Sequence, residues 1–161
     1  MTRGTLTDGE PLTIMRRWLL ALLAIGMIGS SVDLVLLEHY EEAWQMVPLA
    51  IMGIALGVIG WVWARESAGA VTALRVVMLL AVATGLLGIL LHYSGNREFQ
   101  LEMDPGLNGW ALFVKIATAK APPALAPASM VQMGLLGLLF TYRHPALTPT
   151  SPGDRLSSTG A

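Results

Sequence analysis

The feature that most constrains this chain is a series of long stretches with few or no charged residues. Residues 47–64 contain no charge at all, and residues 16–39, 70–93 and 125–142 are nearly as apolar. A helix that crosses a bilayer needs roughly 20 mostly apolar residues. Overall, 54% of the 161 residues are hydrophobic and only 13% are charged, which is unlike a typical soluble domain. The sequence therefore predicts an all-α integral membrane protein, a bundle of four transmembrane helices.

The four stretches follow one another with short connections, which indicates a single membrane domain over residues 14–143. Residues 1–13 read as a polar N-terminal segment, and residues 144–161, rich in Pro, Ser, Thr and Gly, as a disordered tail. A cleavable signal peptide at the N-terminus is the competing interpretation. It is disfavoured because the apolar stretch continues to Leu37 and no A-x-A site follows it.

Basic residues predict the orientation of the bundle, since cytoplasmic loops carry an excess of Lys and Arg. With the N-terminus inside, seven basic residues fall on the cytoplasmic side: Arg3, Arg16, Arg17, Arg65, Arg75, Arg143 and Arg155. Three fall outside: Arg97, Lys115 and Lys120. Arg75 lies one turn inside its helix, and we expect its long side chain to reach back to the headgroups. Together with the preference for arginine over lysine, this pattern indicates a multi-pass protein of a bacterial inner membrane with both termini in the cytoplasm.

Residues 94–123 form the only sizeable connection, and they change character midway. Residues 94–104 are polar and read as a solvated turn, whereas Asp104-Pro105 is typical of a helix start. The following residues 105–120 are apolar over most of a helical circumference but too short to span. We therefore expect an extracytoplasmic interfacial or re-entrant helix packed on the bundle. A fifth span is the alternative, and it would put Arg143 on the opposite side.

Small residues recur at the spacing that lets membrane helices approach closely. The predicted packing positions lie in three helices: Gly26, Gly29, Ser30, Gly53, Gly57, Ala81, Gly85 and Gly88. We expect them to form seams inside the bundle, with homodimerisation through Gly53 and Gly57 as the alternative.

The candidate site is polar and lies at the outer end of the bundle. Asp33 continues the stripe of Gly26, Gly29 and Ser30, so we expect its carboxylate to face protein, and His92 ends the corresponding stripe of the third helix. The two side chains would then meet near the outer surface, with His39 and Glu38 as further members. The alternative is that Asp33 only bonds a local polar group and His92 faces the headgroups.

The chemistry visible in the sequence is sparse. The chain has no cysteine and a net charge of -1, which argues against thiol chemistry and nucleic-acid binding. No nucleophile triad or phosphate-binding glycine loop can be found, so we expect no enzymatic activity, no cofactor and no dedicated metal site. Metal or haem ligation by His39 and His92 is a minor alternative.

Two functions remain for the chain after these exclusions. The leading hypothesis is an accessory or assembly subunit that engages the bilayer and other membrane or envelope proteins, or a second copy of itself. Its rival is a small transporter or proton- or metal-handling protein that uses the outer Asp/His site.

Overall fold

The computed structural model describes residues 10–119 and 126–148, and every regular element in these ranges is a helix. Three helices are long and apolar enough to cross a membrane: α1 (Glu10–Leu36), α2 (Ala43–Ala64) and α3 (Ala68–Met103). A short helix α4 (Gly109–Ala117) follows, then α5 (Ala128–Thr141), an apolar helix of 14 residues, and the 3-10 turn η1 (Pro145–Leu147). The all-helical fold and three helices of membrane-spanning length agree with the sequence-based prediction, whereas α5 is shorter than a span and the fourth transmembrane helix stays a prediction.

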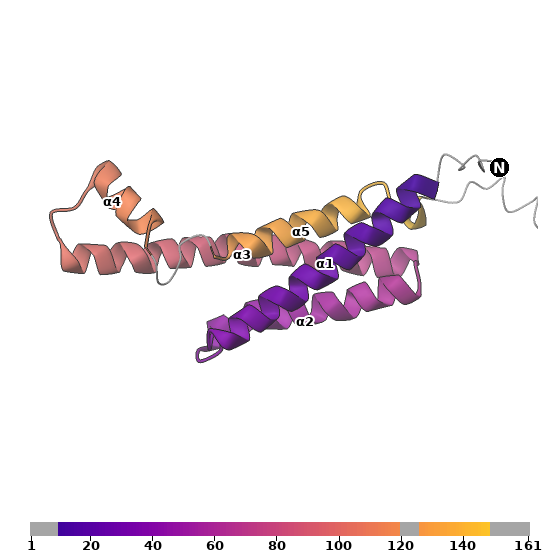
Figure 1. The fold of residues 1–161 in the computed structure, drawn as a ribbon, viewed down its shortest axis with the longest axis horizontal. Coiled ribbons are helices and arrows are strands. Elements are labelled where there is room, and N and C mark those ends of the chain that lie inside the picture. The colour runs from indigo at the N-terminus through magenta and orange to yellow at the C-terminus, as the bar shows by residue number, and fades with distance from the viewer. Residues whose placement is uncertain (1–9, 120–125, 149–161) are drawn as a thin grey trace, which may run out of the picture.

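The long helix α3 is the spine of the molecule (Figure 1). It packs most extensively against α5 and next against α2, while α1 contacts both α2 and α5. The core contains mainly Leu, Met and Ala from four helices: Leu20, Leu23, Met27, Met52, Ala55, Ile59, Val62, Leu74, Met78, Ala81, Met130, Met133 and Phe140. In Figure 1, α1 crosses α5 at an angle, and the hairpin of α1 and α2 diverges from α3 toward its turn.

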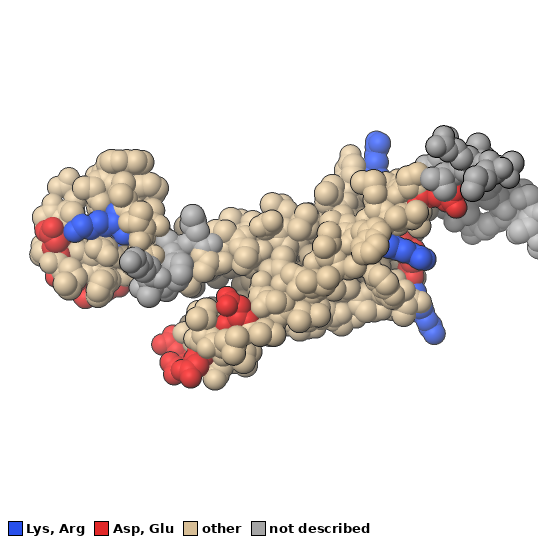
Figure 2. Space-filling view, viewed as in Figure 1, with Lys and Arg blue, Asp and Glu red and all other residues tan. Residues whose placement is uncertain are grey.

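Charge divides the molecule into two ends. We call the end at which α1 begins the basic end, with Arg16, Arg17, Arg65, Arg75 and Arg143, and the other end the acidic end, with Glu38, Glu41, Glu42, Glu98, Glu102 and Asp104. Figure 2 shows acidic side chains on the turn of the α1–α2 hairpin and on the far end of α3, together with some basic ones beside α4. A few acidic side chains also lie among the arginines of the basic end. The asymmetry agrees with the sequence-based distribution of loop charges.

The end of α3 departs from the prediction. The polar turn expected at residues 94–104 does not form, because α3 continues to Met103 and is 36 residues long. At 1.5 Å per residue this is about 54 Å, well beyond a hydrocarbon core of roughly 30 Å. Pro105 explains the stop, since proline disfavours the helical conformation of the residue before it, and Asp104 has the extended angles φ -147 and ψ 90.

The helix expected at residues 105–120 is shorter than predicted. Residues 104–107 form a turn in which Asp104 Oδ1 accepts from the Gly106 N–H at 3.2 Å, and α4 begins only at Gly109. The face that packs on the end of α3 contains Ile116, which is fully buried. Trp110 is 75% exposed and stacks on Phe113. We call residues 94–103 and α4 together the arm.

Other helix ends shift by a few residues, for local reasons. Helix α2 begins at Ala43 instead of residue 47 because Glu42 and Gln45 form a capping box. Helix α1 begins at Glu10, which brings part of the predicted N-terminal segment into the helix. The predicted tail is ordered at its start, where His144 is buried and η1 follows, and its residues 149–161 lie outside the described ranges.

Candidate functional site

At the acidic end the structure brings together the two histidines of the predicted site. His39 lies in the turn after α1, where Glu38 has a positive φ of 54°, and His92 lies on α3. Their ring centroids are 6.2 Å apart, with the rings tilted by 58°. Burial, and secondly the neighbouring His92, lower the pKa of His39, so this imidazole is held in its neutral form near pH 7.

Asp33, the third residue of the predicted site, is not buried as we expected. Its side chain is exposed instead of facing protein, and the exposed Glu38 lies on the same turn as His39. Met133 of α5 covers Gly26 and Ser30 of the same stripe, and α1 diverges from α5 beyond this crossing (Figure 1). The pairing of Asp33 with His92 stays a prediction.

Metal binding at this end gains no support from the geometry. Within residues 10–119 and 126–148, no three His, Asp or Glu side chains gather in a way that could hold a metal ion.

The predicted packing residues divide into two groups. Those of α3 pack closely: a Cβ added at Gly85 would lie 2.9 Å from Val131 N, and one at Gly88 would lie 2.8 Å from Pro127 Cβ, while Ala81 is fully buried. Two further glycines, Gly134 and Gly137, pack against α3 from α5 and were not singled out from the sequence. Gly26 and Ser30 of α1 contact Met133 of α5.

The glycines of α1 and α2 that remain do not form an internal seam. A Cβ added at Gly29, Gly53 or Gly57 would meet no atom within 4 Å, and all three residues are exposed. The expectation of a seam inside the bundle is therefore wrong for these positions.

At the basic end, two arginines bind the carbonyl groups that end α5. Arg75 does not simply reach toward headgroups: its guanidinium donates to Thr141 O at 2.7 Å and to Thr141 Oγ1 at 3.3 Å. Arg16 Nη2 donates to Arg143 O at 3.1 Å and approaches Tyr142 O at 3.5 Å. The last carbonyls of a helix lack intrahelical partners and carry partial negative charge. The two arginines thus cap α5 from α3 and α1.

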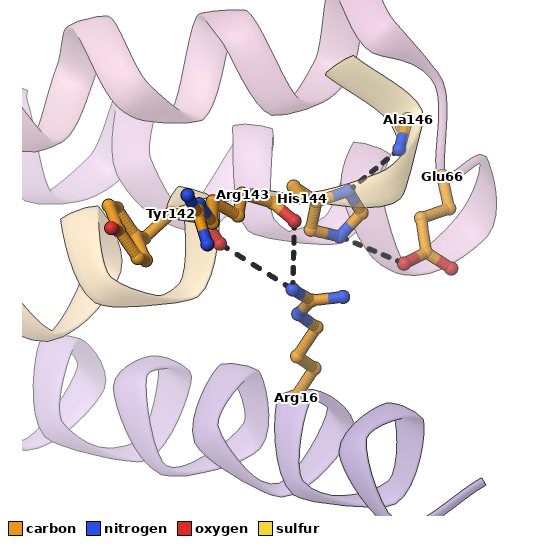
Figure 3. A network of polar contacts seen from close by, with 6 residues as sticks. All are labelled: Arg16, Glu66, Tyr142, Arg143, His144 and Ala146. Atoms are coloured by element: carbon orange, nitrogen blue, oxygen red, sulfur yellow. Dashed lines mark hydrogen bonds and ion pairs between the residues drawn. The ribbon is translucent and has the colours of Figure 1, made fainter. Parts of the chain in front are cut away.

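His144 lies beside this cap, buried to 1% exposure (Figure 3). Its Nδ1 accepts from the Ala146 N–H at 3.3 Å, so Nε2 carries the proton of the neutral ring. Nε2 lies 2.9 Å from Glu66 Oε1, but the N–H is not aligned for a good hydrogen bond. Burial lowers the pKa of His144 and outweighs the opposing effect of Glu66, with Arg16 acting in the same direction as burial.

Two adjoining hollows open around these residues. The first, which we call the arginine pocket, has a volume of ≈ 140 Å³ and is lined by Arg16, Arg17, Leu20, Val62, Trp63, Glu66 and Phe140. The second, the histidine pocket, has ≈ 310 Å³ and is lined by Thr13, Arg16, Glu66, His144, Pro145 and Ala146. The two hollows adjoin, since Arg16 and Glu66 line both of them.

Sequence reasoning placed His144 at the start of a disordered tail and missed this network. A signal was present, because the predicted topology already placed Arg16, Arg17, Arg75 and His144 at helix ends on one side. Side chains at the same end of a small bundle are neighbours, although spacing alone does not say which of them meet.

Comparisons of the chain with protein-family models, with curated proteins and with solved structures found no match. Functional inference therefore rests on the geometry of the chain itself.

Proposed function

We propose that this chain is a non-enzymatic accessory or assembly subunit of a bacterial inner membrane, with both termini in the cytoplasm, which packs against another membrane protein or a second copy of itself. The observation that carries the proposal is the open glycine face of α2. Gly53, Gly57 and Gly60 follow one another at spacings of four and three residues, and a Cβ at any of them would meet nothing within 4 Å.

Glycines at this spacing allow a second helix to approach with its backbone, which supplies packing energy in lipid, where the burial of apolar surface supplies little. The same chain uses glycines in this way between α3 and α5, where Gly85 and Gly134 accept a close neighbour. The α2 face offers an equivalent surface without an internal partner. Exposed Ile54 and Trp61 flank it and would extend the contact.

The arm supplies a second contact region. Since α3 is about 24 Å longer than the hydrocarbon core (54 Å against 30 Å), the arm would project from the membrane surface. It carries the exposed, stacked pair Trp110 and Phe113 together with Glu98 and Glu102. Aromatic residues on an exposed surface are frequent anchors of protein–protein contacts, so the arm suits an envelope protein outside the bilayer.

The transport alternative receives less support. Within the described ranges, the buried polar residues are Asn96 in the arm and Thr141 and His144 at the basic end. Between them the buried core is apolar, and a polar path needs hydrophilic groups along its length.

Co-purification after mild detergent extraction tests the subunit proposal. The native chain should emerge with a partner or as an oligomer, and the double change Gly53→Leu with Gly57→Leu should abolish this association. Gly29→Leu is the matched control, since Gly29 is equally open but lies on α1, and it should leave the association intact. A native chain that always emerges alone as a monomer, or a double variant that keeps its partner, would refute the proposal.

A further inference from the structure

The arginine pocket combines two guanidinium groups with an apolar floor. Arg16 and Arg17 are consecutive residues of α1 and both line it, while Leu20, Val62 and Phe140 supply apolar walls from three helices. Leu20, Val62 and Phe140 are each buried to 2–3% exposure, so the walls belong to the packed core. A fixed apolar floor beneath two charged donors is suited to a ligand that is itself half anionic and half apolar.

Donor groups remain available in this pocket. Both hydrogen bonds of Arg16 to the end of α5 start from Nη2, and a guanidinium has five N–H donors. Arg17 is exposed and lies beside it. Because both arginines line the same pocket, they suit a phosphate, which accepts hydrogen bonds on several oxygens at once.

The local charges also favour a single anion. Arg16 and Arg17 contribute two positive charges and Glu66 one negative charge, and His144 is held neutral by its lowered pKa. The sum of +1 is balanced by one phosphodiester. The carboxylate of Glu66 is turned toward His144, since its Oε1 lies 2.9 Å from His144 Nε2.

The tryptophans indicate the depth of the pocket in a bilayer. Trp63 lines it and is 61% exposed, and Trp18 and Trp61 are also exposed at this end of the bundle. Tryptophan concentrates at the level of the lipid headgroups. The histidine pocket continues from the shared Arg16 and Glu66 toward polar residues such as Thr13. The residues that line the two pockets therefore become more polar in the same order as the parts of a phospholipid: acyl chains, phosphate and headgroup.

From these observations we infer that the arginine pocket binds the phosphate of an anionic phospholipid. The phosphate lies between Arg16 and Arg17, the acyl chains run along Trp63 and the neighbouring apolar surface, and the polar headgroup extends toward the histidine pocket. Basic pockets between helix ends bind anionic headgroups in other membrane proteins. A free phosphate ion shares the central chemistry but lacks the apolar part, so the two sources can be separated. The inference does not depend on a protein partner.

Native mass spectrometry of the delipidated full chain in detergent tests the site. Phosphatidylglycerol and phosphatidylcholine are titrated separately, because both contain the phosphodiester but only the first is anionic overall. We expect one phosphatidylglycerol to bind about tenfold more tightly than phosphatidylcholine, because the choline cation adds a positive charge beside a site that already carries one. Inorganic phosphate should compete only weakly.

Arg17→Gln is the informative variant, since Arg16 also holds the end of α5 and its loss would perturb folding. It should reduce phosphatidylglycerol binding about tenfold, and Arg17→Lys should restore part of it. The matched control is Arg65→Gln, an exposed arginine at the same end that does not line the pocket, which should bind as the native chain does.

Three results would overturn the inference. Equal affinity for the two lipids would show no anion selectivity, and an equal loss in Arg65→Gln would indicate a diffuse surface charge. Displacement of the lipid by inorganic phosphate at matching concentration would show that the apolar floor contributes nothing and that the ligand is the free ion.

Discussion

Replacing Gly134 with alanine tests whether the close approach of α3 and α5 holds this fold together. The added Cβ would lie 2.9 Å from Met78 O and 3.0 Å from Val82 N, besides 2.6 Å from Val82 Cγ2. Two of these three atoms belong to the α3 backbone and cannot rotate away. The helices must therefore separate by about half an ångström to restore ordinary contact distances.

The expected magnitude follows from two opposing effects. Overpacking of this kind costs about 1–3 kcal/mol, whereas replacing a helical glycine with alanine gains about 1 kcal/mol. Gly29→Ala provides the matched control, because Gly29 also lies inside a helix, its Cβ would meet nothing within 4 Å, and it lies outside the open face of α2. The free energy gained from the higher helix propensity of alanine is common to both variants. Their difference, about 1–3 kcal/mol with Gly134→Ala the less stable, isolates the cost of the seam.

Equilibrium unfolding in mixed micelles, followed by tryptophan fluorescence, measures this difference. Gly134→Ala should unfold at a lower denaturant fraction than the native chain, and Gly29→Ala at the same or a higher one. If Gly134→Ala proves as stable as Gly29→Ala, the close packing of α3 on α5 does not limit stability and the reasoning fails.

Two further predictions concern the basic end. Arg75→Met removes both hydrogen bonds to Thr141, whose carbonyl is buried, and should lower the free energy of unfolding by about 1–3 kcal/mol in the same assay. Arg65→Met is the control and should have little effect. Equal effects of the two variants would contradict the capping role. The pKa of His144 is lowered in the folded chain, so on acidification the histidine takes up a proton in the unfolded chain first. Stability should therefore decline as the pH falls below about 6.5 and level off below the folded pKa. Thermal unfolding between pH 8 and 5 should show a larger decline in the native chain than in His144→Gln, in which only the contribution of His39 remains. A His144-dependent gain in stability at low pH would mean that Glu66 controls the histidine instead.

The existence of the long helices could be predicted from the sequence, because three stretches are apolar enough to require a helix in lipid. The end of α3 could not be placed by composition. Ser94, Gly95 and Asn96 resemble a turn, yet each is tolerated in a helix when its neighbours favour one. Pro105 is the first residue in this segment that physically excludes the helical conformation of its predecessor, and α3 indeed ends at Met103.

The glycine seams illustrate a different limit. Spacing correctly indicated close packing at Gly85 and Gly88, but the same spacing at Gly53 and Gly57 marks a face with no internal partner. In a soluble helix the polar face identifies the outside. Helix α2 is apolar all round, so its sequence contains no signal that separates a face toward protein from a face toward lipid.

Helix α5 explains why the number of spans could not be read from apolar length alone. Its 14 residues extend about 21 Å, which is less than the hydrocarbon thickness. The start of α5 lies beside Gly85 and Gly88 of α3, so α5 begins before it reaches the position of His92 along that helix. Such a helix needs external support at its ends, because the terminal N–H and C=O groups lack partners within the helix. Arg75 and Arg16 provide this support at the C-terminus. The position of α5 is therefore set by α3 and α1 more than by its own hydrophobicity, and α5 should be the first helix to detach when the α3 seam is disturbed.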